Sequence, residues 1–321
     1  MSQSIISAVH CHNEEAAYAF VEAQLWPNGP VCPHCGATER IGKMGGKSTR
    51  IGTYKCYVCR KTFTVKIGTI FEDSHIPLRF WLQAVALMCG SKKGISSNQL
   101  HRTLGITLKS AWFLGHRIRE AMRSGYLAPF GVNGGTVESD ETFIGTEPGK
   151  QIRRGFAHKR KILSLIDRDS QTARSFVVDA VNAKTIVPIL KENIEKEARI
   201  VTDDAGQYHY LKDHFADHEV VCHSQGEYVS LQDRTVHVNC AENFFSVFKR
   251  GMKGVYQHCK KQHLHRYLAE FDFRYNNRCG KGVGDTERAE LLLKGVAGKR
   301  LTYQTTDRQS GVMENAQEKT D

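Results

Sequence analysis

The sequence predicts an α/β fold with a mixed β-sheet, preceded by a small metal-binding module and a helical segment. Three observations lead to this prediction. Residues 136–278 alternate between strand-like and helix-like patterns, two C-x-x-C pairs stand near the N-terminus, and residues 79–123 show helical periodicity. The order strand, strand, strand, helix, strand, helix, strand, helix suits a layered α/β domain with a mixed sheet.

The composition is that of a globular protein with a polyanionic partner. The chain has 321 residues, of which 40% are hydrophobic and 25% charged, and this excludes a disordered chain. The net charge of +11 and the pI of about 9.1 favour nucleic acid, because Lys and Arg neutralise phosphates and release counterions. No signal peptide is recognised and no run approaches the length of a membrane span, so we expect no membrane partner.

Residues 28–70 are predicted to form a zinc ribbon. Cys32 and Cys35 form one C-x-x-C pair, and Cys56 and Cys59 form a second. Four thiolates at this spacing suit tetrahedral Zn²⁺, and a segment too short to bury a core needs a metal to fold. Without an export signal, metal binding is favoured over disulfides or redox-active thiols.

Residues 75–125 are predicted to form a helix-turn-helix-like DNA-binding segment. After a buried helix over 79–90, an S-x-x-Q capping box at Ser96 begins a short helix that ends at Gly105, and a longer helix follows over 108–123. A plain helical hairpin has the same pattern, so both interpretations stay open. The residues of the longer helix that we expect to be exposed toward DNA are Lys109, Ser110, His116, Arg117, Arg119 and Arg123.

The two ends of the chain are expected to be smaller additions. Residues 1–27 should form a helix that begins after Asn13, a good N-cap. Residues 281–321 should form a last helix over 286–296 and a polar tail from about residue 302, which is predicted to be disordered.

The α/β domain is predicted to cover residues 136–280. A hairpin turn at 168–171 joins the second and third strands, and a basic run at 149–161 is expected to loop out. The predicted strands are 136–144, 162–167, 173–181, 199–202 and 219–222, and the predicted helices are 183–198, 208–215, 237–253 and 264–278.

The helix over 237–253 is the element around which the domain is organised. At 100° per residue its sequence separates into an apolar face and a polar face. The apolar side chains are Cys240, Ala241, Phe244, Phe245, Val247, Phe248 and Met252. The polar face carries one carboxylate, Glu242, among amides and cations that include Lys249 and Arg250.

Acidic residues near two predicted strand ends complete a candidate site with Glu242. Carboxylates from two strands and a helix could hold Mg²⁺ at a phosphodiester. The residues alone do not select Asp140 over Glu138 or Glu141, nor Asp203 over Asp204. Isolated surface charges remain the alternative interpretation.

Taken together, the motifs resemble DDE transposases of bacterial insertion sequences that carry an N-terminal zinc ribbon. The resemblance covers about residues 15–280, and the order and spacing of the motifs both fit. The matching motifs are CPHCG at 32–36, CYVC at 56–59, KIGTIFEDSHIPLRFW at 66–81, SDETFIG at 139–145, VTDDAGQY at 201–208, HVNCAENFFSVFKRGMKG at 237–254 and HLHRYLAEFDFRYNNR at 263–278.

This resemblance implies an RNase H-like catalytic domain with Asp140, Asp203 and Glu242 as a triad for Mg²⁺ or Mn²⁺. Lys249 and Arg250, about two turns beyond Glu242, would contact DNA phosphate. The implied reaction is cleavage at the inverted repeats of the element, followed by transfer of the freed 3′-hydroxyl to target DNA. We therefore expect double-stranded DNA as partner, a homodimer or larger assembly on it, and a cytoplasmic, nucleoid-associated bacterial protein.

Three other functions fit parts of the sequence less well. One is a catalytically silent DNA-binding protein derived from a transposase, which would keep the zinc ribbon and the helix-turn-helix-like segment. Another is an RNase H-like nuclease of host origin that acts on RNA–DNA hybrids or junctions. The last is a zinc-stabilised scaffold, which the basic charge and the carboxylate set disfavour.

Overall fold

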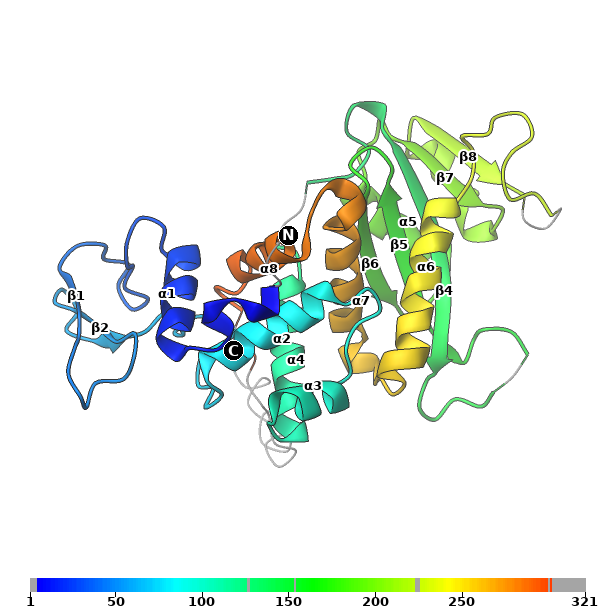
Figure 1. Cartoon of the computed structure of the whole chain (residues 1–321). Coiled ribbons are helices and arrows are strands. Elements are labelled where there is room, and N and C mark those ends of the chain that lie inside the picture. The colour runs from blue at the N-terminus through cyan, green and yellow to red at the C-terminus, as the bar shows by residue number, and fades with distance from the viewer. Residues whose placement is uncertain (1–4, 126–127, 153, 223–225, 300, 302–321) are drawn as a thin grey trace, which may run out of the picture.

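The computed structural model describes residues 5–125, 128–152, 154–222, 226–299 and 301. They form a zinc-ribbon module, a helical module and a sheet domain, which lie in this order across Figure 1. The predicted disordered tail lies outside the described residues. Among the described residues, no helix has the length and apolar character that crossing a membrane requires.

The N-terminal module consists of one helix and a small antiparallel sheet. Asn13 caps α1, as predicted, by accepting a hydrogen bond from the backbone N–H of Ala16. Trp26 follows this helix and packs edge-on against the rings of Tyr54 and Phe63, so the helix and the sheet share one apolar cluster. The elements are α1 (Glu14–Leu25), β1 (Ile41–Lys43), β2 (Tyr54–Cys56) and β3 (Thr62–Phe63), with strand order β1-β2-β3.

The helical module combines distant parts of the chain. Ser96 and Thr107 cap α3 and α4, and Gly105 ends α3 with φ of +64°, so the predicted helix boundaries here are confirmed. The last helix, α8, packs into the same core as α1, α2 and α4, and it therefore belongs to this module. The elements are α2 (Leu78–Gly90), α3 (Ser97–Leu104), α4 (Leu108–Met122) and α8 (Asp285–Lys294).

The sheet domain is a mixed five-stranded sheet in the order β6-β5-β4-β7-β8. Strands β4, β5 and β6 pair antiparallel, and β7 and β8 add in parallel on the other side of β4. This confirms the predicted mixed α/β fold. The strands are β4 (Thr136–Thr146), β5 (Lys159–Asp167), β6 (Thr172–Val178), β7 (Arg199–Asp203) and β8 (Asp217–Val221).

Helices cover both faces of this sheet (Figure 1). α5 (Ala183–Asn193) covers one face, while α6 (Asn239–Gly251) and α7 (Lys261–Asn276) cover the other. The apolar face predicted for α6 is confirmed, because Ala241, Phe244, Phe245, Phe248 and Met252 are buried against the sheet and α7. A π-helical turn, Met252–Tyr256, follows α6 directly.

Two predicted segments differ from the structure. The helix expected over 208–215 is replaced by two 3₁₀ turns, Gly206–Tyr208 and Leu211–Asp213. Tyr208 and Leu211 are buried in the core under α5, so tertiary packing determines this segment's conformation. Part of the basic run expected to loop out, from Lys159 onward, belongs to β5.

A buried charge network joins the helical module to the sheet domain. Glu270 on α7 is fully buried and accepts hydrogen bonds from Arg119 of α4 at 2.7 Å and from Arg274 at 2.8 Å. The hydroxyl of Tyr256 donates to the same carboxylate at 2.6 Å. The guanidinium of Arg119 also stacks on the rings of Tyr256 and Tyr267.

Candidate active site and zinc site

The four predicted zinc ligands converge in the ribbon. Their sulfur atoms all lie within 4.8 Å of one another. The Cys32–Cys59 and Cys35–Cys56 sulfur pairs are each 3.7 Å apart. A tetrahedral Zn²⁺ with Zn–S bonds of about 2.3 Å requires S–S separations of about 3.8 Å, so the cluster has the size of such a site.

Two similar turns hold these cysteines. The backbone N–H of Gly36 donates to the carbonyl of Cys32, and Gly36 has φ of +74°. Arg60 stands at the equivalent position of the second pair with φ of +63°, in the left-handed region that a non-glycine residue enters at some cost. The second turn is closed by a hydrogen bond from the N–H of Cys56 to the carbonyl of Lys61.

Strand register brings Asp140 and Asp203 to one face of the large sheet. Glu138 of β4 pairs with Val201 of the parallel strand β7. Asp140 and Asp203 each lie two residues further along, and side chains two residues apart share a face. Glu138 contacts the backbone of α6, so this is the face that α6 covers.

The alternative acidic residues have other surroundings. Glu141 points to the opposite face, where its carboxylate accepts hydrogen bonds from Tyr208 at 2.5 Å and Gln207 at 3.2 Å. Glu138 is fully buried and forms an ion pair with Arg168. Asp204 follows the end of β7 and lies outside the strand alternation that aligns Asp203 with Asp140.

Electrostatic coupling links the two aspartates to Glu242 on α6. Burial and, to a smaller extent, the negative charges of Glu141, Asp203 and Glu242 together raise the pKa of Asp140 to about 8. Glu242 itself lies on the exposed side of α6. Among the described residues, only the four cysteines form a group that is compact enough to hold a metal ion. The three carboxylates therefore stand further apart than the ligands of one tightly held ion.

Lys249 lies near these carboxylates, whereas Arg250 bonds to its own helix. Burial lowers the pKa of Lys249, while the charges of Asp140 and Glu242 oppose this shift. The exposed Arg250 donates from Nε to the carbonyl of Ser246 at 3.1 Å. Lys249 is therefore the better placed of the two to hold an anion at the acidic cluster.

The N-terminus of α6 is anchored by Glu138 and Arg168, a role that the sequence did not predict. Val238, the N-cap residue, makes no side-chain capping bond. Instead Glu138 accepts a hydrogen bond from the N–H of Ala241 at 2.9 Å, and its other oxygen accepts from Arg168 at 2.6 Å. The sequence signal for this role was Glu138 itself, which lies two residues before Asp140 on the same face of β4. Strand β4 thereby positions both Asp140 and the helix that carries Glu242.

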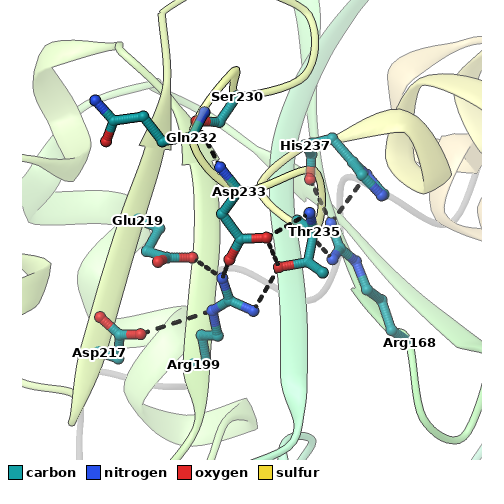
Figure 2. Close-up of polar contacts among 9 residues, drawn as sticks. All are labelled: Arg168, Arg199, Asp217, Glu219, Ser230, Gln232, Asp233, Thr235 and His237. Carbon is teal, nitrogen blue, oxygen red and sulfur yellow. Dashed lines mark hydrogen bonds and ion pairs between the residues drawn. The ribbon is translucent and has the colours of Figure 1, made fainter.

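Two arginines hold the segment that leads into α6 (Figure 2). Arg168 donates to the carbonyls of Thr235 and His237, both at 2.5 Å. Arg199 donates to Asp233 and Thr235, each at 2.9 Å, and it also pairs with Glu219 and Asp217 of β8. The start of α6 is thus tied to β4, β7 and β8 together.

The predicted DNA-facing side of α4 needs correction. Lys109, in the first turn, and Arg123, at the end, are exposed as expected. His116, Arg117 and Arg119 are buried, with 3% or less of each exposed, so the expectation that they face DNA was wrong. Arg117 donates to the carbonyls of Glu72 and Leu301 instead, because α4 is central in its module.

The fold and the two sites define a zinc-ribbon protein with an acidic cluster on a mixed α/β sheet. Residues 12–62 match the model of a transposase zinc-ribbon domain, and residues 133–276 match that of an ISXO2-like transposase domain. Together these matches cover more than half of the chain. The chain belongs to this family of insertion-sequence transposases, and DNA is accordingly its partner.

A curated relative supports this assignment. The chain is 29% identical over 266 residues to an uncharacterized protein in transposable element ISH50 of Halobacterium salinarum. The alignment covers 78% of this chain and 86% of the relative. The similarity therefore extends over most of both chains.

Proposed function

We propose that this chain is an active DDE transposase that cleaves DNA at the inverted repeats of its element and transfers the freed ends to target DNA. The observation that carries the proposal is that Asp140 and Asp203 share the face of the sheet that is covered by α6, the helix of Glu242. The strand order, with β4 flanked by an antiparallel pair and two parallel strands, supports an RNase H-like domain. The triad would be the catalytic one.

The donor set fits a hard divalent cation such as Mg²⁺ or Mn²⁺. All three side chains offer carboxylate oxygens, the ligands that Mg²⁺ prefers. Burial and neighbouring negative charge raise the pKa of Asp140 to about 8, as expected of a carboxylate cluster that needs a cation to ionise together. Divalent ions bound there would activate an attacking oxygen and stabilise the leaving oxygen.

The chain's own residues would orient the DNA. Lys249, beside Asp140 and Glu242, would hold the phosphate at the cleavage point, and Arg250 would contact the backbone further along α6. The zinc ribbon, which would hold Zn²⁺ through its four cysteines, and Lys109 at the start of α4 would bind the inverted repeats. Arg117, which was predicted to contact DNA, is buried and bonds to backbone carbonyls, so it would not contact DNA.

The reaction also sets expectations for assembly and location. Joining two DNA ends in one event requires two catalytic domains close together, so we infer a homodimer or larger assembly on DNA. Since the substrate is chromosomal DNA, the protein would work in the cytoplasm at the nucleoid.

The test is cleavage of labelled DNA that carries the element's own ends, with and without Mg²⁺. We expect nicking at the ends only with Mg²⁺, and a loss of at least about 100-fold in Glu242→Gln because an ion ligand is removed. Glu287→Gln, which changes an exposed carboxylate on α8, is the matched control and should cleave normally. Binding of the ends without cleavage would instead favour a catalytically silent DNA-binding protein.

A further inference from the structure

A cavity of about 680 Å³ lies between the helical module and the sheet domain. Its walls come from the end of α2, from α6, from the second half of α7 and from the start of α8. α7 stands between the helical module and the sheet (Figure 1). The volume is within the range of about 300–1,000 Å³ that is usual for ligand pockets, and none of the three proposed catalytic carboxylates lines it.

The cavity is strongly cationic. Lys92, Arg274, Arg278 and Arg288 line it, against a single carboxylate, Asp285. Asp285 is already paired with Arg288, at 2.6 Å. Arg274 is paired with the buried Glu270, so the remaining positive charge comes from Lys92 and Arg278, and it favours an anionic ligand.

Arg274, which lines this cavity, has two buried donors without a hydrogen-bond partner in the part of the chain that the structure describes. Its side chain is only 8% exposed, and its Nη1 donates to the carbonyl of Ser91 at 3.0 Å and to Glu270 at 2.8 Å. Nε and Nη2 are buried without a hydrogen-bond partner among the described residues. A buried guanidinium normally has its donors satisfied, and phosphate oxygens are acceptors that it binds strongly.

Aromatic and amide side chains complete the lining. Tyr275 provides a partly exposed ring beside Phe244 and Phe271, which are each 3% exposed, and Asn239 and Asn243 provide amides at the exposed side of α6. Nucleobases stack on aromatic rings, and amides can bond to their edges. Rings and amides beside open cationic donors fit a nucleotide better than a bare anion.

The position of the cavity suggests which nucleotide it would hold. Asn239, which lines the cavity, lies three residues before Glu242 on α6, and residues at this spacing are neighbours on a helix surface, so the cavity borders the face that carries the proposed catalytic carboxylate. We propose that the cavity binds one unpaired nucleotide of a DNA strand, with its phosphate near Arg274 and Lys92 and its base against the aromatic rings. This inference rests on the proposed DNA-cleaving function and adds a second DNA contact to it.

The test compares two duplexes that differ in one nucleotide. The full-length protein, with its zinc and without added Mg²⁺, is titrated into a paired duplex and into the same duplex with one unpaired 2-aminopurine nucleotide near the end. We expect binding of the unpaired probe to be about tenfold tighter, with quenched 2-aminopurine fluorescence as the base stacks. Equal affinity for the two duplexes would overturn the proposal.

Matched variants locate the effect. Lys92→Glu reverses a charge in the lining, and Asn243→Trp fills the mouth of the cavity from an exposed position. Both should abolish the preference for the unpaired probe, whereas Lys93→Glu, at an exposed neighbour outside the lining, should retain it. Loss of the preference in all three variants, or in none, would contradict binding in this cavity.

Competition distinguishes a nucleotide in DNA from a smaller anion. An unlabelled single-stranded oligonucleotide should displace the probe, deoxyadenosine monophosphate should do so only at higher concentration, and inorganic phosphate should be weakest. If inorganic phosphate competes as well as the mononucleotide, the cavity is an anion site and the proposal fails. Because no Mg²⁺ is present, a preference that persists while cleavage fails would uphold the cavity and reject only the proposed catalysis.

Discussion

At the scale of single residues, the acidic cluster shows how neighbours change the chemistry of one carboxyl group. Asp140 and Glu141 are adjacent in sequence, yet strand alternation sends one toward α6 and the other toward Tyr208. Burial raises the pKa of both, to about 8 for Asp140 and to about 7 for Glu141. The negative charges of such carboxylates repel one another, and a bound divalent cation would reduce this repulsion.

This repulsion predicts a pH-dependent gain in stability for Asp140→Asn. The pKa of Asp140 rises from 3.8 to about 8 on folding, so between these pH values the native state binds more protons than the unfolded state. Stability is therefore lost as pH rises through this window. Without Mg²⁺, Asp140→Asn should be more stable than wild type by about 2 kcal/mol above pH 8, and the difference should vanish near pH 4.

Thermal unfolding at several pH values, with zinc retained, measures this difference. Asp213→Asn, at an exposed position, is the control and should follow the wild type at every pH. Addition of Mg²⁺ should stabilise the wild type and reduce the difference, because only the wild type keeps all three carboxylates. If the stabilities of Asp140→Asn and wild type changed with pH in the same way, the pKa of Asp140 would not be raised in the folded protein.

At the scale of elements, the zinc ribbon depends on its metal more than on its core. The fully buried residues of its cluster are only Cys32, Tyr54, Cys56 and Phe63, and two of these are candidate zinc ligands. We expect one zinc per chain, and loss of zinc with unfolding of the ribbon in Cys56→Ala. Metal analysis and hydrogen exchange measure both effects. Cys222→Ala, outside the ribbon, is the control, and zinc retained by Cys56→Ala would refute the four-cysteine site.

The anchoring of α6 gives a second prediction at this scale. Glu138→Ala leaves the N–H of Ala241 without its acceptor and Arg168 without its carboxylate, so we expect a loss of about 3 kcal/mol in unfolding free energy. Glu138→Gln keeps an acceptor and should lose less. Because the helix positions Glu242, cleavage by Glu138→Ala should slow while DNA affinity is unchanged.

Urea unfolding and single-turnover cleavage test this anchoring role. Glu219→Gln, which removes one of the three carboxylates around Arg199 but leaves the contacts of Glu138 intact, is a suitable control. Equal cleavage rates for Glu138→Ala and wild type, at temperatures where both are folded, would mean that Glu138 acts in stability alone.

Elements with strong local signals could be predicted from the sequence, and those set by distant contacts could not. The capping residues Asn13, Ser96 and Thr107 act within three residues of themselves, and the helices they start were predicted. The burial of Arg117 depends on carbonyls of Glu72 and Leu301, which are far from it in sequence. Helical periodicity alone made its basic residues look like a solvent-facing surface.

The candidate site divides in the same way. The spacing of the cysteines was sufficient to predict their cluster, since two tight turns need only local sequence. To distinguish Asp140 from Glu138 and Glu141, one needs the register of β4 against β7, and these two strands pair residues that are more than sixty positions apart in the sequence. Resemblance alone supplied the choice of Asp140 as a catalytic residue, whereas the contacts of Glu138 and Arg168 with the start of α6 came from the structure alone.

At the scale of the whole molecule, the buried network around Glu270 couples the helical module to the sheet domain. Arg119 comes from α4, Arg274 and Glu270 from α7, and Tyr256 from the turn after α6. A transposase must keep bound DNA in a fixed position relative to the residues that cut it. This network would hold the helical module and the sheet domain in a fixed position relative to each other. Wild type should therefore unfold both parts in one cooperative transition.

Glu270→Ala tests this coupling because it leaves two buried arginines unpaired. We expect the free energy of unfolding to fall by about 3–5 kcal/mol and the helical module and the sheet domain to unfold separately. Calorimetry and hydrogen exchange measure these two effects. Asp285→Ala, which breaks a half-exposed pair with Arg288, is the control and should cost less than about 1 kcal/mol. A single transition retained by Glu270→Ala would show that apolar packing of α4 against α7, rather than the charge network, unites the two parts. In that case cleavage should survive the substitution, because the frame that relates bound DNA to the carboxylates would be intact.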